Sequence, residues 1–270
     1  MAIQPPNAPD VLWKYRDWGD FARRMIVDGE IHFSTLEQLN DPFEFRWQDQ
    51  YPATHQELDR FVRAVLQKKF PLDSVQQRRI RYAQALSEVR QLAANGRGRS
   101  PTVTRLFHGV FSVSEINDDV LMWSHYANHH RGICVGVRPK VINKLFLPVG
   151  YVDDVPVLNV WHYVGDENSR DNFVYLSLAK AKRWEYEVEW RSISHKGVQH
   201  FLGCVGAVVL GCKISKNDRD EVLEAIERAS EPITVYEAQL SNTKYTLNIR
   251  PLVTAMRNDD GTENRISKRR

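Results

Sequence analysis

The chain has 270 residues, 42% of them hydrophobic and 26% charged, with a formal net charge of +3. This composition is that of an ordinary globular protein, and the length allows one large domain with a sizeable core. No run approaches the ~20 apolar residues that a membrane span needs. The first ten residues show no basic segment followed by an apolar one, so we expect no secretory signal and a cytoplasmic location.

The net charge and the cysteines exclude further classes of partner and of site. A net charge of +3 is too small to indicate a polyanionic partner by itself. Basic runs around Arg97 and at the C-terminal tail leave nucleic-acid contact as an alternative to a solvated loop and terminus. Cys204 and Cys212 bracket an apolar run that reads as an extended strand, which holds them beyond disulfide reach. We expect these two and Cys134 to be reduced, buried thiols, with no zinc knuckle.

The N-terminal part predicts short alternating elements. Residues 12–15 read as an extended run, followed by a helix that stops at Asp28-Gly29, a typical C-cap. Residues 30–34 alternate as a short strand. A turn at residues 40–44 follows because Pro42 disfavours the helical region for Asp41.

Two helices are predicted next, at 55–70 and 75–94, and we interpret them as a helical insertion over about 55–96. The first has an apolar stripe at helical spacing, formed by Leu58, Phe61, Val62, Val65, Leu66 and Phe70.

The rest of the chain favours β structure. We expect strands at 109–114, 132–137, 148–154, 182–194 and 201–214, and a hairpin of 233–240 with 244–249. Helices are predicted at 119–129 and 215–229, and 161–183 reads as partly helical. The order lacks the regular alternation of a doubly wound sheet. The predicted fold is α+β: a single domain over 11–252 with a mixed or antiparallel sheet, the helical insertion, and flexible termini at 1–10 and 253–270.

The predicted strand at 182–194 carries an unusual charge pattern. Glu185, Glu187 and Glu189 have two-residue spacing, which places three carboxylates on one strand face. Such a face is tolerable if cations or ligand hydroxyls meet it, and Arg191 on the same face, with Lys180 or Lys182 upstream, could pair with it. The alternative is a solvated face opposite lysines of a neighbouring strand.

Four segments mix bulky aromatic side chains with polar groups that are costly to bury unpaired. They are residues 13–16, 33–44, 123–132 and 184–191. Such a mixture converging on one place is typical of a small-molecule pocket. The alternatives are that Trp123 and Tyr126 are core residues, and that Asn40-Asp41-Pro42 forms only a turn.

These segments, in this order, resemble a bacterial family catalogued as domain of unknown function 2971. The resemblance rests on Lys14-Tyr15-Arg16, Phe33-Ser34, Asn40–Glu44, Trp123–Ala127 with His130 and Gly132, and Trp184–Arg191. It spans roughly residues 12–193 and implies membership without implying a reaction.

A second resemblance, in the kind and order of residues, is to ADP-ribosyltransferases, and it implies a split-sheet fold and NAD as substrate. It implies that Arg16 holds the cofactor diphosphate, Ser34 positions the nicotinamide ribose, and Glu189 is the catalytic carboxylate. Glu187 would orient an acceptor macromolecule. Further cofactor-binding candidates are Tyr15, Asn40, Trp123, His125, Tyr126, His130 and Arg191. The sequence departs from that pattern in having Phe33-Ser34-Thr35 in place of a Ser-Thr-Ser triplet.

An enzyme of this kind would suit a toxin or phage-defence setting. Two other hypotheses stay open beside it. One is a non-catalytic sensor whose pocket binds a nucleotide-like ligand, and the other is a structural interaction module. His125 and His129 are four residues apart on a predicted helix, but no carboxylate or cysteine completes a metal site, so no metal is expected. A nucleophile elbow, a Walker loop and a dinucleotide-binding glycine motif are all missing from the sequence.

Overall fold

The computed structural model describes residues 7–95, 109–160 and 176–252. Its described residues form two compact units, each built from segments that are distant in sequence. Unit 1 contains His32–Ser112 and Leu145–Val198, and unit 2 contains Asn7–Ile31, Val113–Lys144 and the segment that begins at Gln199.

The largest sheet has eight strands and is mixed, which confirms the predicted α+β class. Its order is β14 (Leu247–Pro251), β13 (Thr234–Leu240), β12 (Val205–Leu210), β5 (Ile133–Val137), β1 (Leu12–Arg16), β4 (Gly109–Ser114), β10 (Glu189–Ser194) and β6 (Phe146–Pro148). β12 and β13 pair in parallel, whereas β1 with β5, β5 with β12, and β13 with β14 are antiparallel. The last of these pairs is the predicted C-terminal hairpin.

Three pairs of short strands accompany this sheet. They are β2 (Glu30–Phe33) with β11 (Gly197–His200), β3 (Gln48–Gln50) with β8 (Val157–Asn159), and β7 (Gly150–Val152) with β9 (Ala179–Ala181). The β7–β9 pair is parallel and sets Tyr151 opposite Lys180. The predicted strand at 148–154 is therefore two short strands, β6 and β7.

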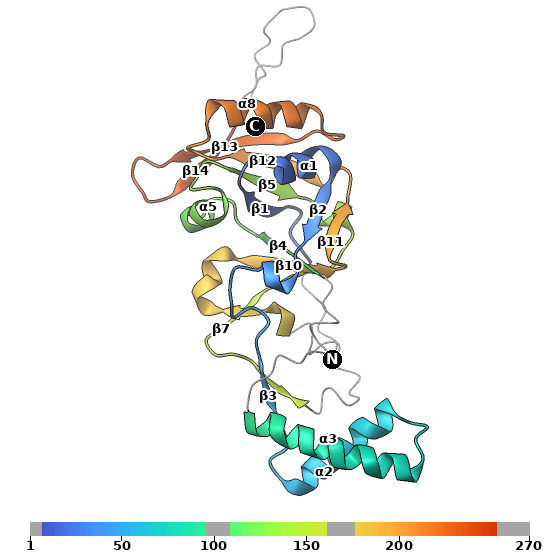
Figure 1. Cartoon of the computed structure of the whole chain (residues 1–270). Helices are drawn as coiled ribbons and strands as arrows, with labels where there is room; N and C mark the ends of the chain where they lie inside the picture. The colour runs from blue at the N-terminus through green and yellow to red at the C-terminus, as the bar shows by residue number, and fades with distance from the viewer. Residues whose placement is uncertain (1–6, 96–108, 161–175, 253–270) are drawn as a thin grey trace, which may run out of the picture. The chain divides into compact units, whose positions relative to one another are not determined.

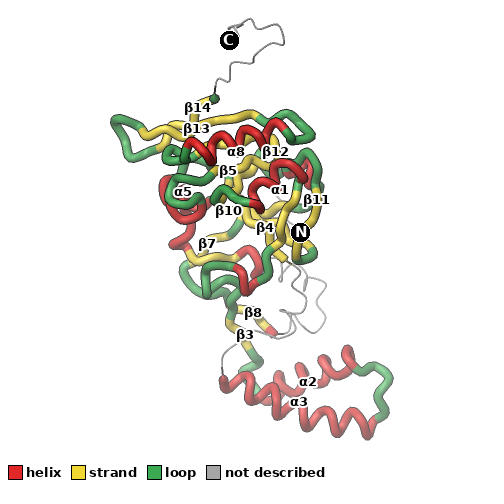
Figure 2. Tube along the Cα trace, turned by 45° about the horizontal axis from the view of Figure 1, so that its top comes forward, coloured by secondary structure: helices red, strands yellow, loops and turns green. Residues whose placement is uncertain are grey.

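The described part of unit 2 contains the predicted helices and one short helix that the sequence did not predict. They are α1 (Asp20–Asp28), α5 (Val120–Tyr126), the short α6 (Pro139–Ile142) and α8 (Lys216–Glu227). Gly29 ends α1 at φ 65°, and a Cβ there would lie 2.4 Å from the Phe201 carbonyl oxygen, so only glycine fits. Asp119 and Ser215 cap α5 and α8 by accepting hydrogen bonds from backbone N–H groups in the first turn. α8 and α1 lie side by side next to the sheet strands of this unit (Figures 1 and 2).

The core of unit 2 consists of β5 and β12, which read as continuous apolar runs because both faces are covered. Every residue of β5 is buried. Cys134 and Cys204 lie in this core as free, buried thiols, as predicted, whereas Cys212 is free but only half-buried. Burial raises the pKa of each thiol, so none is an activated nucleophile.

In unit 1 the predicted helical pair is present as α2 (His55–Lys69) and α3 (Val75–Asn95), an antiparallel hairpin visible in Figure 2. Phe61, Val62 and Leu66 of α2 are buried, and Tyr82 and Leu86 of α3 pack against them. Thr54 and Glu57 form a reciprocal capping box at the start of α2. A second apolar cluster holds the remainder of this unit together and consists of Phe45, Trp47, Val110, Leu158 and Leu176.

The predicted strand at 182–194 is wrong in its first half. Lys182–Glu187 forms a 3-10 helix, η3, which ends at Val188 in the left-handed region with φ 42°, and β10 begins only at Glu189. The tight turn leaves Glu185 exposed and directs Glu187 inward, so the three glutamates do not share a strand face. The turn thus separates Glu185 from the other two carboxylates.

Two other element boundaries differ from expectation. α5 ends at Tyr126, and Asn128, His129 and His130 follow with φ of 46°, 55° and 69°. His125 and His129 are therefore not one turn apart on a helix. The strand expected over 201–214 is confined to 205–210. Predictions for 1–6, 96–108, 161–175 and 253–270, including the basic runs, lie outside the described residues.

Candidate functional site

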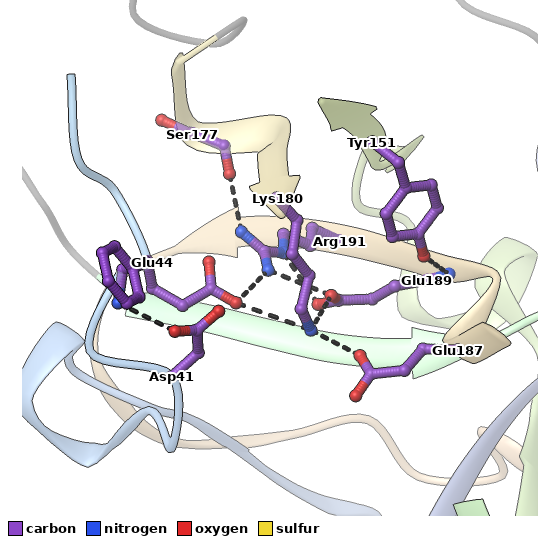
Figure 3. Close-up of polar contacts among 9 residues, drawn as sticks. Asp41, Glu44, Tyr151, Ser177, Lys180, Glu187, Glu189 and Arg191 are labelled. Carbon is purple, nitrogen blue, oxygen red and sulfur yellow. Dashed lines mark hydrogen bonds and ion pairs between the residues drawn. The ribbon is translucent and has the colours of Figure 1, made fainter. Parts of the chain in front are cut away.

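Five charged side chains of unit 1 form one buried cluster, shown in Figure 3 and called the ion cluster below. Its members are Glu44, Lys180, Glu187, Glu189 and Arg191. Glu44 lies in the turn after residue 40, Lys180 lies on β9, Glu187 ends η3, and the other two lie on β10. Each residue is at most 6% exposed, although Lys, Glu and Arg are almost never fully buried unless paired.

Lys180 is the central cation of the ion cluster. Its Nζ lies 2.8 Å from Glu189 Oε2 and 3.5 Å from Glu44 Oε1, and it also donates to Glu187 Oε2. The Trp184 ring lies 5.2 Å from the same nitrogen. Burial alone would lower the pKa of Lys180, but the carboxylates outweigh it and raise that pKa. The amine is therefore held as a cation and is not available as a nucleophile.

Arg191 makes the second set of contacts. Its Nε donates to Glu189 Oε1 at 2.7 Å and its Nη2 to Glu189 Oε2 at 3.0 Å, a bidentate pair. Nη2 also donates to Glu44 Oε1 at 2.7 Å, and Nη1 donates to the Ser177 carbonyl at 2.9 Å. Burial would raise the pKa of Glu189, but Arg191 and Lys180 prevail and lower it. Glu189 is thus held as an ionised carboxylate with both oxygens engaged.

The ion cluster contains one more carboxylate than it contains cations. Three glutamates against one lysine and one arginine give a formal net charge of −1 when all five are ionised. Burial is the leading cause that raises the pKa of Glu44, and Arg191 opposes it without cancelling it. A buried ion pair is costly to desolvate and is weak evidence for a stabilising role by itself. The ion cluster is therefore a candidate functional site.

The backbone around the ion cluster is fixed by further hydrogen bonds. The Glu189 N–H donates to Tyr151 Oη at 2.8 Å, and the Val149 N–H donates to the Glu189 carbonyl at 2.8 Å. Burial raises the pKa of Tyr151 to about 12, so its hydroxyl keeps its proton. In the turn before Glu44, Asp41 Oδ1 accepts from the Phe43 N–H at 2.8 Å, which confirms the predicted turn.

Of the predicted site residues in unit 1, Glu187, Glu189 and Arg191 come together in the ion cluster. The predicted pairing of Arg191 with Glu189 and of Lys180 with the glutamates is confirmed. Ser34 forms a backbone bridge with Val110, and Asn40 is exposed in its turn. These two residues are not members of the ion cluster.

The predicted site residues of unit 2 include a group of aromatic side chains around Trp123. Tyr15 Oη donates to the Ile116 carbonyl at 3.0 Å, and Trp123 Nε1 donates to the Asn117 carbonyl at 2.8 Å. Their rings meet edge to face at 5.5 Å, and both side chains are buried. This geometry is typical of core residues and agrees with the alternative that Trp123 belongs to the core. The His130 ring lies parallel to the Trp123 ring at 6.5 Å, and His125 meets Tyr126 edge to face at 6.1 Å.

Arg16 ends β1, where the strand pleat directs it to the face opposite Tyr15. Its Nε is buried and has no hydrogen-bond partner within the described part of the chain. Burial lowers the pKa of its guanidinium. The prediction that Arg16, Tyr126 and Glu189 line one cavity concerns residues of both units and stays a prediction.

Three residues in or beside the ion cluster were not among the predicted site residues: Glu44, Lys180 and Tyr151. Glu44 belongs to the Asn40–Glu44 motif, of which only Asn40 was among the predicted site residues. Lys180 was recognised only as a possible counter-charge. Tyr151 carries no sequence signal, since its role depends on the β7–β9 register.

Within the described ranges, no group of three or more His, Cys, Asp or Glu side chains is arranged to hold a metal ion. Among the described residues, no helix is long and apolar enough to cross a membrane. No family model, no curated protein and no solved structure matches the chain.

Proposed function

We propose that unit 1 catalyses an NAD-dependent transfer of ADP-ribose at the ion cluster. The observation that carries this proposal is that Glu187 and Glu189, the two carboxylates of the Glu-x-Glu pattern, are buried and meet at Lys180 Nζ. Membership in the family of domain of unknown function 2971 is part of the same proposal and rests on the sequence motifs alone.

The charge of the ion cluster suits this reaction. When nicotinamide leaves NAD, positive charge develops on the ribose carbon that held it. A preorganised group of negative charge in a water-poor environment stabilises such a transition state more than water does. Arg191 and Lys180 keep Glu189 ionised, and ribose hydroxyls are donors that match carboxylate oxygens. In the proposal Glu189 is the catalytic carboxylate and Glu187 orients the acceptor.

The test is release of labelled nicotinamide from NAD by purified protein, in the presence and absence of candidate acceptor proteins. We expect Glu189→Gln and Glu187→Gln to reduce release by about 100-fold or more. Glu185→Gln is the matched control because Glu185 is exposed in the same segment, and it should release nicotinamide like the wild type. Equal release by wild type and Glu189→Gln would refute the assignment, and no release by the wild type would refute the reaction.

A second candidate function is a non-catalytic sensor of a nucleotide-like ligand, and it is favoured by Arg16. A buried guanidinium nitrogen without a partner is costly, and a phosphate group would satisfy it. Calorimetric titration with NAD and ADP distinguishes the two functions. Binding that is lost in Arg16→Gln, retained in Glu189→Gln and accompanied by no nicotinamide release supports the sensor. Arg24→Gln, which alters an exposed arginine of the same unit, is the control.

We also propose a cytoplasmic location, since all three cysteines are free thiols, as in a reducing compartment. The acceptor would be a macromolecule, and a toxin or phage-defence setting is proposed from the resemblance to ADP-ribosyltransferases.

A further inference from the structure

The two carboxylate oxygens of Glu44 have opposite environments. Oε1 accepts from Arg191 Nη2 at 2.7 Å and lies 3.5 Å from Lys180 Nζ. Oε2 is buried and has no hydrogen-bond partner among the described residues. Figure 3 shows the difference directly: dashed lines reach one oxygen of Glu44 and none reaches the other. Glu44 itself is 6% exposed, so bulk water does not satisfy the second oxygen.

The charges of the other four members of the ion cluster sum to zero. Arg191 and Glu189 act on Glu44 from β10 and Lys180 from β9, whereas Glu187 pairs with Lys180 from η3. These four side chains carry two positive and two negative charges, so they already neutralise one another. Glu44 therefore adds the unbalanced negative charge, and an ionised, unpartnered oxygen in this place is unfavourable. A proton, an ordered water or a donor from a ligand completes its environment.

The backbone supports a special role for this position. Phe45 and Val188 adopt φ of 55° and 42°, and each directly follows a glutamate of the ion cluster. The other described non-glycine residues with positive φ are Asn or His, which tolerate that region better than bulky or β-branched residues do. Strained backbone of this kind persists where the surrounding structure enforces it, and it concentrates at functional sites.

We propose that Glu44, and not Glu189, is the acid–base group of the ion cluster, and that it receives the acceptor's proton on Oε2. This inference rests on the proposed function. The nucleophilic atom of the acceptor bonds to the ribose carbon while the bond from that carbon to the nicotinamide nitrogen breaks. The electron pair of the broken bond neutralises the nicotinamide ring, and the proton of the nucleophile passes to Glu44. Arg191 and Lys180 are positioning residues, since they act through the two glutamates.

The electrostatics agree with this division of roles. The pKa of Glu44 is raised, chiefly by burial, whereas that of Glu189 is lowered because Arg191 and Lys180 outweigh its burial. Two carboxyl groups whose environments separate their pKa values are the usual sign of an acid–base group beside an electrostatic one. Glu189, ionised throughout, would stabilise charge, and Glu44 would exchange the proton.

The first test is the pH profile of nicotinamide release in the presence of acceptor. Glu44→Gln should lower release about 100-fold and abolish the rise in rate that follows deprotonation of a single group. Glu189→Gln should lower release at every pH and keep that rise, and Glu185→Gln should match the wild type. A Glu44→Gln variant with the wild-type rate and profile would overturn the inference while leaving the proposed function intact.

The second test does not depend on activity. The wild type, labelled with ¹³C at the glutamate carboxyl carbons, is titrated by NMR, and the Glu44 signal is assigned by its absence in Glu44→Asp. We expect that signal to titrate above the ordinary value of 4.5. Titration at or below 4.5 overturns the inference even if the Gln variant fails to fold. If the wild type releases no nicotinamide, the proposed reaction fails, and the titration still decides whether Glu44 exchanges a proton.

Discussion

Arg191 Nη2 lies 2.7 Å from Glu44 Oε1, and the two residues are 147 positions apart in the sequence. The contact joins the turn after residue 40 to strand β10 inside unit 1. Both side chains are buried, so the guanidinium and the carboxylate have exchanged water for each other. Arg191 favours the ionised form of Glu44, although burial still raises the pKa of that carboxyl group.

Removing the Arg191 guanidinium should therefore destabilise the fold strongly. Arg191→Met leaves Glu44 and Glu189 without their main partner, and we expect a loss of about 3–5 kcal/mol in the free energy of unfolding. Urea denaturation at neutral pH measures it. Arg228→Met is the control, because Arg228 pairs with Glu224 on the exposed surface of α8, where such pairs contribute about 0–1 kcal/mol. Equal losses in the two variants would contradict the prediction.

Lys180→Met should make stability depend on pH in a characteristic direction. Lys180 favours the ionised form of Glu44, so without the ammonium the folded-state pKa of Glu44, which is already raised, should rise further above the unfolded value. A raised carboxyl pKa gives stability that is present at low pH and lost as pH rises through the folded value. Lys180→Met should thus lose more stability at pH 8 than at pH 5, as measured by urea denaturation. Lys182→Met should lose almost nothing at either pH, because Lys182 is exposed and 3.9 Å from Asp153.

Glu44→Gln should become more stable relative to the wild type as pH rises. The pKa of Glu44 is raised above its ordinary value of 4.5, so its contribution is full below 4.5 and is lost as pH rises through the folded value. Glutamine does not titrate and keeps a donor for neutral pairing. The difference in free energy of unfolding should grow by about 1.4 kcal/mol for each unit of the pKa shift. A difference that does not change between pH 4 and pH 8 would show that Glu44 is not perturbed.

Val188→Gly should stabilise the protein. Val188 has φ 42°, a left-handed conformation that costs a β-branched residue about 1–2 kcal/mol and glycine almost nothing. Allowing for the lost side-chain contacts, we expect a gain of about 0.5–1 kcal/mol, measured as a higher midpoint in thermal unfolding. Val198→Gly in β11 is the matched control, since its backbone is not left-handed and glycine weakens a strand. A loss of stability in both variants would show that Val188 is not strained.

Gly132→Ala should destabilise unit 2 by several kcal/mol. A Cβ at this position would lie 2.1 Å from the Arg16 carbonyl oxygen, and a backbone atom of a sheet strand cannot move aside cheaply. The resulting overpacking exceeds the usual 1–3 kcal/mol of an enlarged core residue. Gly150→Ala is the control, because no other atom lies within 4 Å of a Cβ there. Comparable unfolding midpoints for the two variants would contradict the close approach.

The parts of the fold that the sequence predicted are those with a local signal. The stripe of Phe61, Val62 and Leu66 predicted α2, and the Gly29 cap predicted the end of α1, because periodicity and capping are encoded in neighbouring residues. The two-residue spacing of Glu185, Glu187 and Glu189 is also a local signal, and it led to a wrong strand prediction. It matches a strand locally, whereas Val188 adopts a left-handed conformation that ends η3 and delays the strand to Glu189.

The candidate site was predictable only in part. Glu187, Glu189 and Arg191 lie in one segment and were identified together. Glu44 was hidden in a motif that also has a purely structural explanation, since Asp41 forms the turn. Its importance follows from which oxygen remains unpartnered, and no property of a linear sequence reports that.

The interleaving of the two units has a consequence for synthesis on the ribosome. β1 pairs with β5, whose other edge pairs with β12, so the first strand to emerge joins a sheet completed only after residue 205 is translated. Unit 1 likewise awaits β10 before Glu44 meets Arg191. The nascent chain must therefore carry unpaired strand edges for most of its elongation, a state that exposes it to chaperones and to aggregation. No single truncation point separates the units, and a gene cut between them would leave both halves incomplete.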